Sequence, residues 1–302
     1  MNANRLPTTI PEYLEHLRRS LAGADPALIQ DALYDAEEYL RSELAENPGR
    51  SEAEVIAAVA SSYGAPEEVA DIYRDTEVTV QTALRAPPPK PRASLAGRFF
   101  GVAADPRAYA SLFYMVLALA TGIFYFTWVV AGLSLSAGLA ILIIGIPFVI
   151  LFFGSVRILS LVEGRIVEVM LGERMPRRPL YNARGRSILQ RIGDMFTDPR
   201  SWSTLLYMLL MLPLGIFYFT VAVAMGSLSL GLLLSPLALL PGADYAVWFW
   251  GFDLVEDAAW LLPLVSLVGA LLLFVTLHLA RAIGRVHGLL AKHLLVKTAQ
   301  YA

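Results

Sequence analysis

The sequence predicts an all-α fold, in which a small cytoplasmic helical bundle precedes a polytopic membrane domain of about four transmembrane helices built from two repeats. Hydrophobic residues make up 56% of the 302 residues, above the roughly 45–50% that is usual in soluble domains. The excess starts near Ala108, in apolar stretches of about 20 residues, the length that crosses a bilayer core. Helix-capping signals before Ala108 and a duplication after it place the individual elements.

Charge divides the chain near the same point. Residues 1–77 hold sixteen Asp and Glu against six Arg, a net charge of −10, and the remainder carries a net charge of +8. An acidic domain does not seek nucleic acid by itself, so no direct nucleic-acid partner is expected. The N-terminus lacks the apolar segment of a signal peptide, which favours a cytoplasmic first domain.

Helix punctuation predicts three or four helices over residues 9–76, within a domain of residues 1–80. The predicted starts are capping boxes or prolines, at Thr9, Pro26, Ser51 and Pro66. The predicted ends are Gly23, Asn47-Pro48-Gly49 and Gly64. Apolar residues recur at helical spacing between these points, and the fourth helix, around Val69 and Tyr73, is expected to be short.

The outer surface of this bundle is acidic. A solvated face is the simpler interpretation, and a docking face for a basic partner is the alternative. The candidate docking residues are Asp31, Asp35, Glu37, Glu38, Glu67 and Glu68.

Three segments of the first domain resemble the bacterial HAAS signalling domain, over roughly residues 9–77. They are Tyr13-Leu14-x-x-Leu17, Asp35-Ala36-Glu37-Glu38-Tyr39-Leu40 and Tyr63-Gly64-Ala65-Pro66-Glu67-Glu68-Val69-Ala70. The resemblance implies a cytoplasmic regulator of the PadR type, or a membrane complex, as the partner. Residues 81–100 follow as a proline-rich basic linker, which is typical of a semi-rigid spacer.

An internal repeat organises the membrane domain, with residues 101–197 as the first copy and residues 198–302 as the second. Asp105-Pro106-Arg107 recurs as Asp198-Pro199-Arg200, and Gly122-Ile123-Phe124-Tyr125-Phe126-Thr127 recurs unchanged from Gly215, at the same offset of 93. Gly164-Arg165 and Gly284-Arg285 are 120 apart, so the second copy carries an insertion of 27 residues. It lies between about Leu233 and Pro263.

Each copy is predicted to form two spanning helices joined by a short Ser-Leu-Ser turn. The predicted spans are roughly 108–131, 137–160, 202–226 and 259–282. Residues 228–240 are too short to span well, so re-entry into the membrane and extension of the hairpin both remain open. Because each copy crosses twice, the two copies are expected to be parallel.

Lys and Arg placement predicts both termini and the central loop on the cytoplasmic side of a bacterial inner membrane. The central segment holds nine arginines between Arg157 and Arg200, whereas the insertion holds four acids and no Lys or Arg. This loop, about residues 162–197, is expected to form amphipathic helices on the membrane surface. Because this loop is positively charged, we also expect it to bind the acidic domain.

The membrane half, about residues 98–295, resembles a bacterial family of sensor domains that occurs at the N-terminus of some histidine kinases and in stand-alone proteins. The resemblance is carried by Asp198-Pro199-x-x-Trp202, Leu205-Leu206-Tyr207, Leu212-Pro213-Leu214-Gly215 and Glu163-Gly164-Arg165. Only about 15 residues follow Arg285, so no kinase core is expected, and a signal would leave through the acidic domain, the arginine-rich loop or a partner.

Two groups of candidate site residues follow from these features. The candidate sensing residues combine acids with aromatic rings in the insertion, and an aromatic belt at the outer interface is their simpler interpretation. They are Asp244, Trp248, Trp250, Asp253, Glu256 and Asp257. The candidate transmission residues border the arginine-rich loop, and they are Glu163, Arg165, Arg177 and Arg178.

Catalytic and metal sites are not expected. The chain has no cysteine, and His287 and His293 are six residues apart, a poor spacing for two ligands on one helix. The sequence therefore predicts a membrane-bound sensory or regulatory protein without a cofactor or enzymatic activity, in contact with membrane lipid and able to form a homodimer. A small transporter or an accessory subunit of one is the alternative, although the predicted spans contain almost no ionisable groups.

Overall fold

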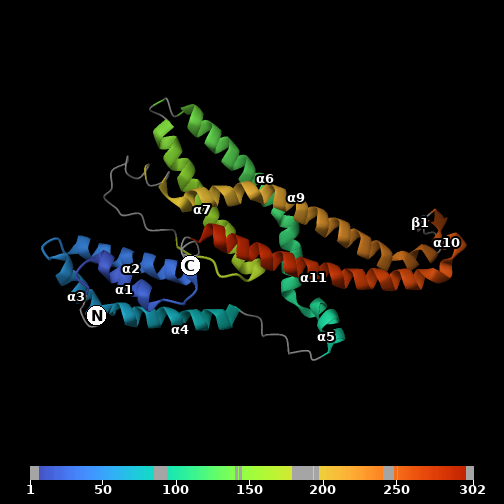
Figure 1. The fold of residues 1–302 in the computed structure, drawn as a ribbon, viewed down its shortest axis with the longest axis horizontal. Coiled ribbons are helices and arrows are strands. Elements are labelled where there is room, and N and C mark those ends of the chain that lie inside the picture. Colours follow the sequence, from blue (N-terminus) through green and yellow to red (C-terminus); the bar gives the residue numbers. More distant parts are fainter. Residues whose placement is uncertain are drawn as a thin grey trace.

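A computed structural model of the chain describes residues 7–84, 94–139, 142, 145–178, 193, 197–240, 248–249 and 251–296, without the side chains of residues 79–84 and 252. The molecule is elongated, with the N-terminal bundle at one end and a long helical hairpin at the other (Figure 1). Apart from one short ribbon, the secondary structure described is helical.

The N-terminal domain contains four helices: α1 Ile10–Ser20, α2 Pro26–Glu46, α3 Glu52–Ser62 and α4 Pro66–Leu84. The predicted caps are present, because Thr9 accepts from the amide of Glu12 and Ser51 forms a complete capping box with Glu54. Tyr13, Leu17 and Ile56 are fully buried in its core. Gly64 has a φ of 117°, a backbone conformation that favours glycine, and its carbonyl accepts from the Tyr13 hydroxyl.

Helix α4 is longer than predicted, and it enters the segment that was expected to be a linker. No proline or glycine interrupts the chain between Pro66 and Pro87, so nothing local ends the helix after Tyr73. The added turns carry Glu77, which is buried against Arg174.

Four helices of the second half are long and apolar enough to cross a membrane: α6 Pro106–Leu139, α7 Gly145–Leu171, α9 Pro199–Leu233 and α11 Leu262–Leu295. Helix α5 Leu95–Phe100 and a 3₁₀ turn, η1 Gly101–Ala104, precede them. The insertion contains η2 Ser235–Leu239, β1 Trp248–Phe249, β2 Phe252–Asp253, α10 Leu254–Asp257 and η3 Ala259–Leu261. Strands β1 and β2 pair antiparallel.

The helix boundaries correct several predictions. Both Ser-Leu-Ser segments lie inside helices α6 and α9, where Ser229 donates to the Met225 carbonyl at 2.6 Å and so satisfies its hydroxyl without a turn. Residues 228–240 extend the hairpin as the end of α9 and η2. Val162 to Met170 belong to α7 rather than to a surface helix, and the remainder of the predicted amphipathic segment, around Ile188 to Met195, lies largely outside the described residues.

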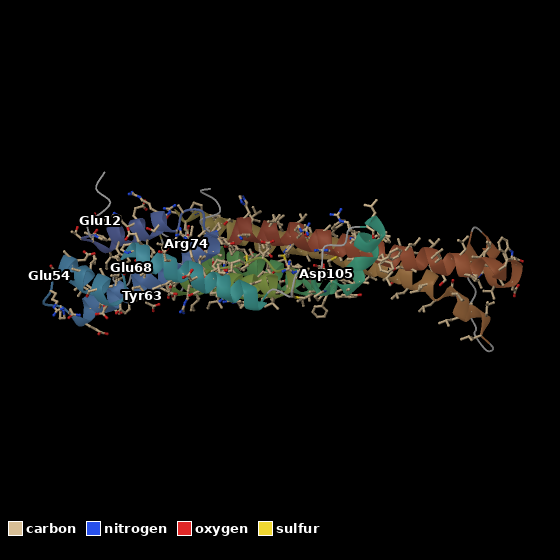
Figure 2. All side chains as sticks on the ribbon, turned by 90° about the horizontal axis from the view of Figure 1, so that it is seen from below. Glu12, Glu54, Tyr63, Glu68, Arg74 and Asp105 are labelled. Atoms are coloured by element: carbon tan, nitrogen blue, oxygen red, sulfur yellow. The ribbon has the colours of Figure 1, made fainter. Side chains whose placement is uncertain are left out.

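Helices α6 and α9 cross at glycines that the repeat placed at equivalent positions. A Cβ atom at Gly122 would collide with the Met211 carbonyl, and one at Gly215 would collide with the Ala118 carbonyl. Gly122 and Gly215 are equivalent residues 93 positions apart, as are Ala118 and Met211, so the two contacts are equivalent under exchange of the copies. Along the long axis, α6 runs toward the N-terminal domain and α9 runs away from it (Figures 1 and 2). The direction in which each copy crosses a membrane stays a prediction.

Candidate functional site

Six polar side chains meet inside the membrane domain, and all four long helices contribute to them. Glu163 of α7 accepts from the hydroxyls of Tyr114 at 2.8 Å and Tyr207 at 2.9 Å on Oε1, and from Tyr125 at 2.9 Å on Oε2. His287 of α11 lies beside it, with Nε2 at 2.6 Å from the Tyr114 hydroxyl. We call these residues, together with Tyr218, the polar cluster.

One assignment of protons that satisfies the hydrogen bonds of the polar cluster has Glu163 ionised. With Glu163 ionised, three tyrosine hydroxyls donate to its two oxygens. The proton of His287 then lies on Nε2, shared between the oxygens of Tyr114 and Tyr207, and Nδ1 accepts from Tyr218 at 3.1 Å. Every contact thereby has a donor and an acceptor, as burial requires. Glu163 and His287 are both 0% exposed.

Sequence reasoning missed five of these six residues. It found Glu163 only as a loop-border residue and dismissed His287 as a metal ligand, because the predicted spans ended before both. The repeat contained the missing signal, since Tyr114 and Tyr207, like Tyr125 and Tyr218, are equivalent residues 93 positions apart. Polar residues retained at equivalent positions within two apolar spans indicate a shared buried site.

A second polar contact joins the acidic domain to the segment after α7. Asp31 of α2 accepts from Arg174 at 2.9 Å on Oδ2, and from the amides of Arg177 at 2.7 Å and Arg178 at 2.9 Å on Oδ1. Arg174 also pairs with Glu77 at 2.9 Å, and Arg178 pairs with Asp35 at 3.0 Å. We call this set the docking interface.

Two further contacts extend the docking interface to the other membrane helices. Gln30 donates to the Arg178 carbonyl at 3.0 Å and accepts from Arg200, in the first turn of α9, at 3.2 Å. Asp25, the N-cap of α2, binds Lys292 near the end of α11 at 2.5 Å. Helix α2 therefore lies against α9, α11 and the segment after α7, and the expected contact between the acidic domain and the arginine-rich loop is present.

The central pair of the docking interface is buried, with side-chain exposures of 10% for Arg174 and 7% for Asp31. Burial raises the pKa of the Asp31 carboxyl, although Arg174 and the amides of Arg178 and Arg177 oppose this rise. A buried ion pair gains little net energy, but removal of one partner leaves the other charge without compensation. The interface therefore depends on both members being in place.

The other predicted docking residues lie outside this contact. Glu37 pairs with Arg41 on its own helix, and Glu38 is exposed. Glu67 and Glu68 are exposed in the first turn of α4. Figure 2 shows Glu68 with Glu12 and Glu54 toward the end of the domain that faces away from the membrane helices.

The predicted transmission residues do not form one group. Glu163 lies in the polar cluster, whereas Arg165 and Arg177 both bind Glu168 near the end of α7. Arg178 belongs to the docking interface. Arg174, the most buried arginine of the segment after α7, was not singled out from the sequence.

The predicted sensing residues gather only in part. Trp248 is 69% exposed and pairs across the ribbon with Asp253, whose carboxylate caps α10. Glu256 and Asp257 are exposed on α10, and Asp244 and Trp250 lie outside the described residues. Among the described parts of the chain, no group of three or more metal-ligating side chains lies close enough to hold an ion.

Comparison with known proteins gives one match. No curated protein and no solved structure matches the chain. A family model with the description "Putative sensor" matches residues 114–295, which begin at Tyr114 and include the whole polar cluster, most of α6 and the other three long apolar helices. The match covers more than half of the chain, and the chain therefore belongs to this family of sensor domains.

Proposed function

We propose that this chain is a membrane-bound sensory protein that relays a membrane or extracytoplasmic signal to a cytoplasmic partner, without a catalytic step of its own. Its output is the acidic domain, which resembles the HAAS domain. The observation that carries the proposal is the docking interface, in which Asp31 and Asp35, two of the acids suited to a basic partner, are occupied by Arg174 and Arg178. A partner competes with these arginines for the same carboxylates.

Helix α7 supplies the connection between the membrane and this output. Glu163 ties α7 to α6 and α9 through tyrosine hydroxyls, and α7 ends at Leu171, three residues before Arg174. Met175 packs on Gly164, one residue beyond Glu163. A signal that rearranges the spanning helices moves this end of α7 and releases α2. The partner is a PadR-type regulator or a membrane complex. Both termini of the chain lie in the cytoplasm in this proposal.

The first experiment removes the central cation and measures domain release. Because the chain has no cysteine, spin labels attach cleanly at Glu38→Cys in α2 and at Leu289→Cys on the exposed side of α11. Arg174→Gln leaves the buried Asp31 without its cation, a loss of about 3 kcal/mol or more. The ratio of docked to released domain should fall about 100-fold, which pulsed electron paramagnetic resonance reads as a broad distribution of longer distances.

Arg165→Gln is the matched control, because Arg165 is a more exposed arginine whose ion pair among the described residues is with Glu168 of its own helix. It should keep the short distance. Pull-down from mild detergent should recover more of the partner with Arg174→Gln than with the parent chain, and none after deletion of residues 1–77. Equal distances in both arginine variants would refute the release mechanism.

Transport is the second candidate, and one observation favours it. The predicted spans contained almost no ionisable groups, but α7 and α11 extend far enough to bury Glu163 and His287 inside the membrane domain. Such residues mark proton and ion pathways in many transporters. Proton flux into proteoliposomes of the pure protein, abolished by Glu163→Gln, would support transport and displace the sensory proposal.

A further inference from the structure

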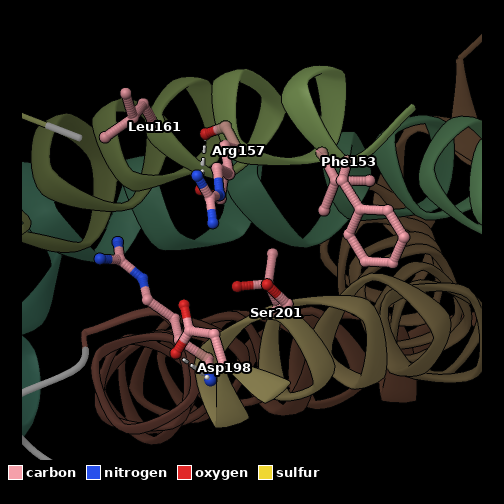
Figure 3. A pocket seen from close by; sticks show the side chains of 9 residues that line it. Phe153, Arg157, Leu161, Asp198 and Ser201 are labelled. Carbon is pink, nitrogen blue, oxygen red and sulfur yellow. Dashed lines mark hydrogen bonds between the residues drawn. The ribbon is translucent and has the colours of Figure 1, made fainter. Parts of the chain in front are cut away.

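A narrow pocket lies between α7 and the first turns of α9, separate from the polar cluster. Figure 3 shows Arg157 and Phe153 on α7 facing Asp198 and Ser201 on α9 across this gap. Arg200 and Thr204 complete the polar side, and Phe153 and Val156 form part of the apolar side. The lining is thus polar at the start of α9 and apolar toward Phe153.

The pocket has an excess of positive charge. Arg200 is only 9% exposed, and its guanidinium donates to the neutral oxygen of Gln30 at 3.2 Å. Within the described residues, neither Arg157 nor Arg200 forms a salt bridge with a carboxylate. Among the described residues, the acid in the lining is Asp198, which caps α9 by accepting from the Arg200 amide. Asp198 offsets only part of this charge, because two guanidinium groups face one carboxylate in the lining, so an anion placed between the two arginines stabilises the site.

The surroundings of the pocket indicate where this anion comes from. Ile158 and Trp202, next to Arg157 and Ser201 in the chain, are 64% and 50% exposed, so apolar surface borders the pocket on both helices. Trp at the first turn of a spanning helix is typical of the depth of lipid headgroups. Arginine binds phosphate with two parallel hydrogen bonds and serine adds a third donor. We propose that this pocket binds the phosphate group of an anionic phospholipid.

The pocket is also connected to the acidic domain, and this part of the inference rests on the proposed function. Arg200 joins the pocket to Gln30, and Gln30 in turn binds the carbonyl of Arg178 in the docking interface. A phosphate that binds Arg200 in the pocket therefore changes the hydrogen bonds through which Gln30 stabilises the docked domain. Lipid binding itself is independent of any partner, so it is tested separately.

The test measures lipid retention by the full chain. Purified protein in nanodiscs of phosphatidylcholine with about 20% phosphatidylglycerol is released into mild detergent and analysed by native mass spectrometry. We expect one phosphatidylglycerol to remain bound to the parent chain. Arg157→Gln, which removes a charged donor, should lower the affinity about tenfold. Arg285→Gln, an exposed arginine on α11, is the matched control and should retain the lipid.

Two results would overturn the proposal. Equal loss of lipid in Arg157→Gln and Arg285→Gln would mean that only general surface charge attracts the lipid. Protection of the parent chain from thermal unfolding by inorganic phosphate alone, to the same extent as by phosphatidylglycerol, would assign the pocket to a soluble anion. Neither result depends on domain release, so failure here leaves the docking experiment with Arg174→Gln unaffected.

Discussion

At the scale of single residues, Glu163 links the membrane helices through hydrogen bonds. Its two oxygens accept hydrogen bonds from tyrosine hydroxyls of α6 and α9. The hydroxyls of Tyr114 and Tyr207 also contact Nε2 of His287 on α11. No Lys or Arg among the described residues pairs with it, so these hydroxyls are its stabilising partners. A carboxylate held in this way fixes the relative positions of helices that otherwise meet through apolar contacts alone.

Loss of one hydroxyl should therefore weaken the whole membrane domain. Tyr125 is the one donor to Oε2 of Glu163 among the described residues, so Tyr125→Phe should destabilise the domain by about 1–3 kcal/mol, the value of a hydrogen bond to a charged group. Tyr109→Phe is the control on the same helix, since the Tyr109 hydroxyl binds the Ala103 carbonyl at an exposed position. Melting in mild detergent, followed by tryptophan fluorescence, compares them. A midpoint unchanged by Tyr125→Phe would show that Glu163 needs only two donors.

At the scale of elements, the crossing of α6 and α9 explains why the repeat did not predict how the copies are arranged. Identical segments predict similar helices, and the helices are indeed similar in length. Their relative direction depends on which residues meet at the crossing, and glycines allow close approach in either direction. The arrangement observed lets the hydroxyls of Tyr114 and Tyr207 donate to the same carboxylate oxygen.

The two glycines at this crossing should be equally sensitive to substitution. Ala at Gly122 or at Gly215 places a Cβ atom against a backbone carbonyl of the facing helix, which must move. Each variant should lose about 1–3 kcal/mol, the usual cost of overpacking, and the two melting midpoints should fall together. Gly138→Ala on α6 is the control, because no atom lies near its added methyl. Different losses at Gly122 and Gly215 would contradict the symmetry of the crossing.

Local signals were predictable from the sequence, and long-range contacts were not. The capping boxes at Thr9 and Ser51, the four apolar spans and the charge complementarity of Asp31 with the arginine-rich loop follow from short patterns. The polar cluster joins residues from four helices up to 173 positions apart, from Tyr114 to His287. Helix lengths were also difficult to predict, since Glu163 and Arg165 were placed in the loop that follows a span ending at residue 160, whereas both lie inside α7.

At the scale of the whole molecule, the polar cluster and the docking interface are connected by one helix. Helix α7 carries Glu163 in the first and leads directly to Arg174 in the second. Proximity along a helix does not establish coupling, which requires that a change at one site alters an equilibrium at the other. The docked and released positions of the acidic domain supply that equilibrium.

Glu163→Gln should raise the released fraction of the acidic domain, although Glu163 makes no contact with it. The amide retains the shape of the side chain but brings N–H donors toward hydroxyls that already donate, so α7 loses its position relative to α6 and α9. The spin labels at Glu38→Cys and Leu289→Cys measure this fraction directly. Ser155 lies elsewhere on α7 and accepts a hydrogen bond from Trp128 of α6. Ser155→Ala removes this bond and should leave the released fraction unchanged. If the two sites are coupled, Glu163→Gln combined with Arg174→Gln should release little more than Arg174→Gln alone, whereas independent effects that add would show that α7 does not transmit.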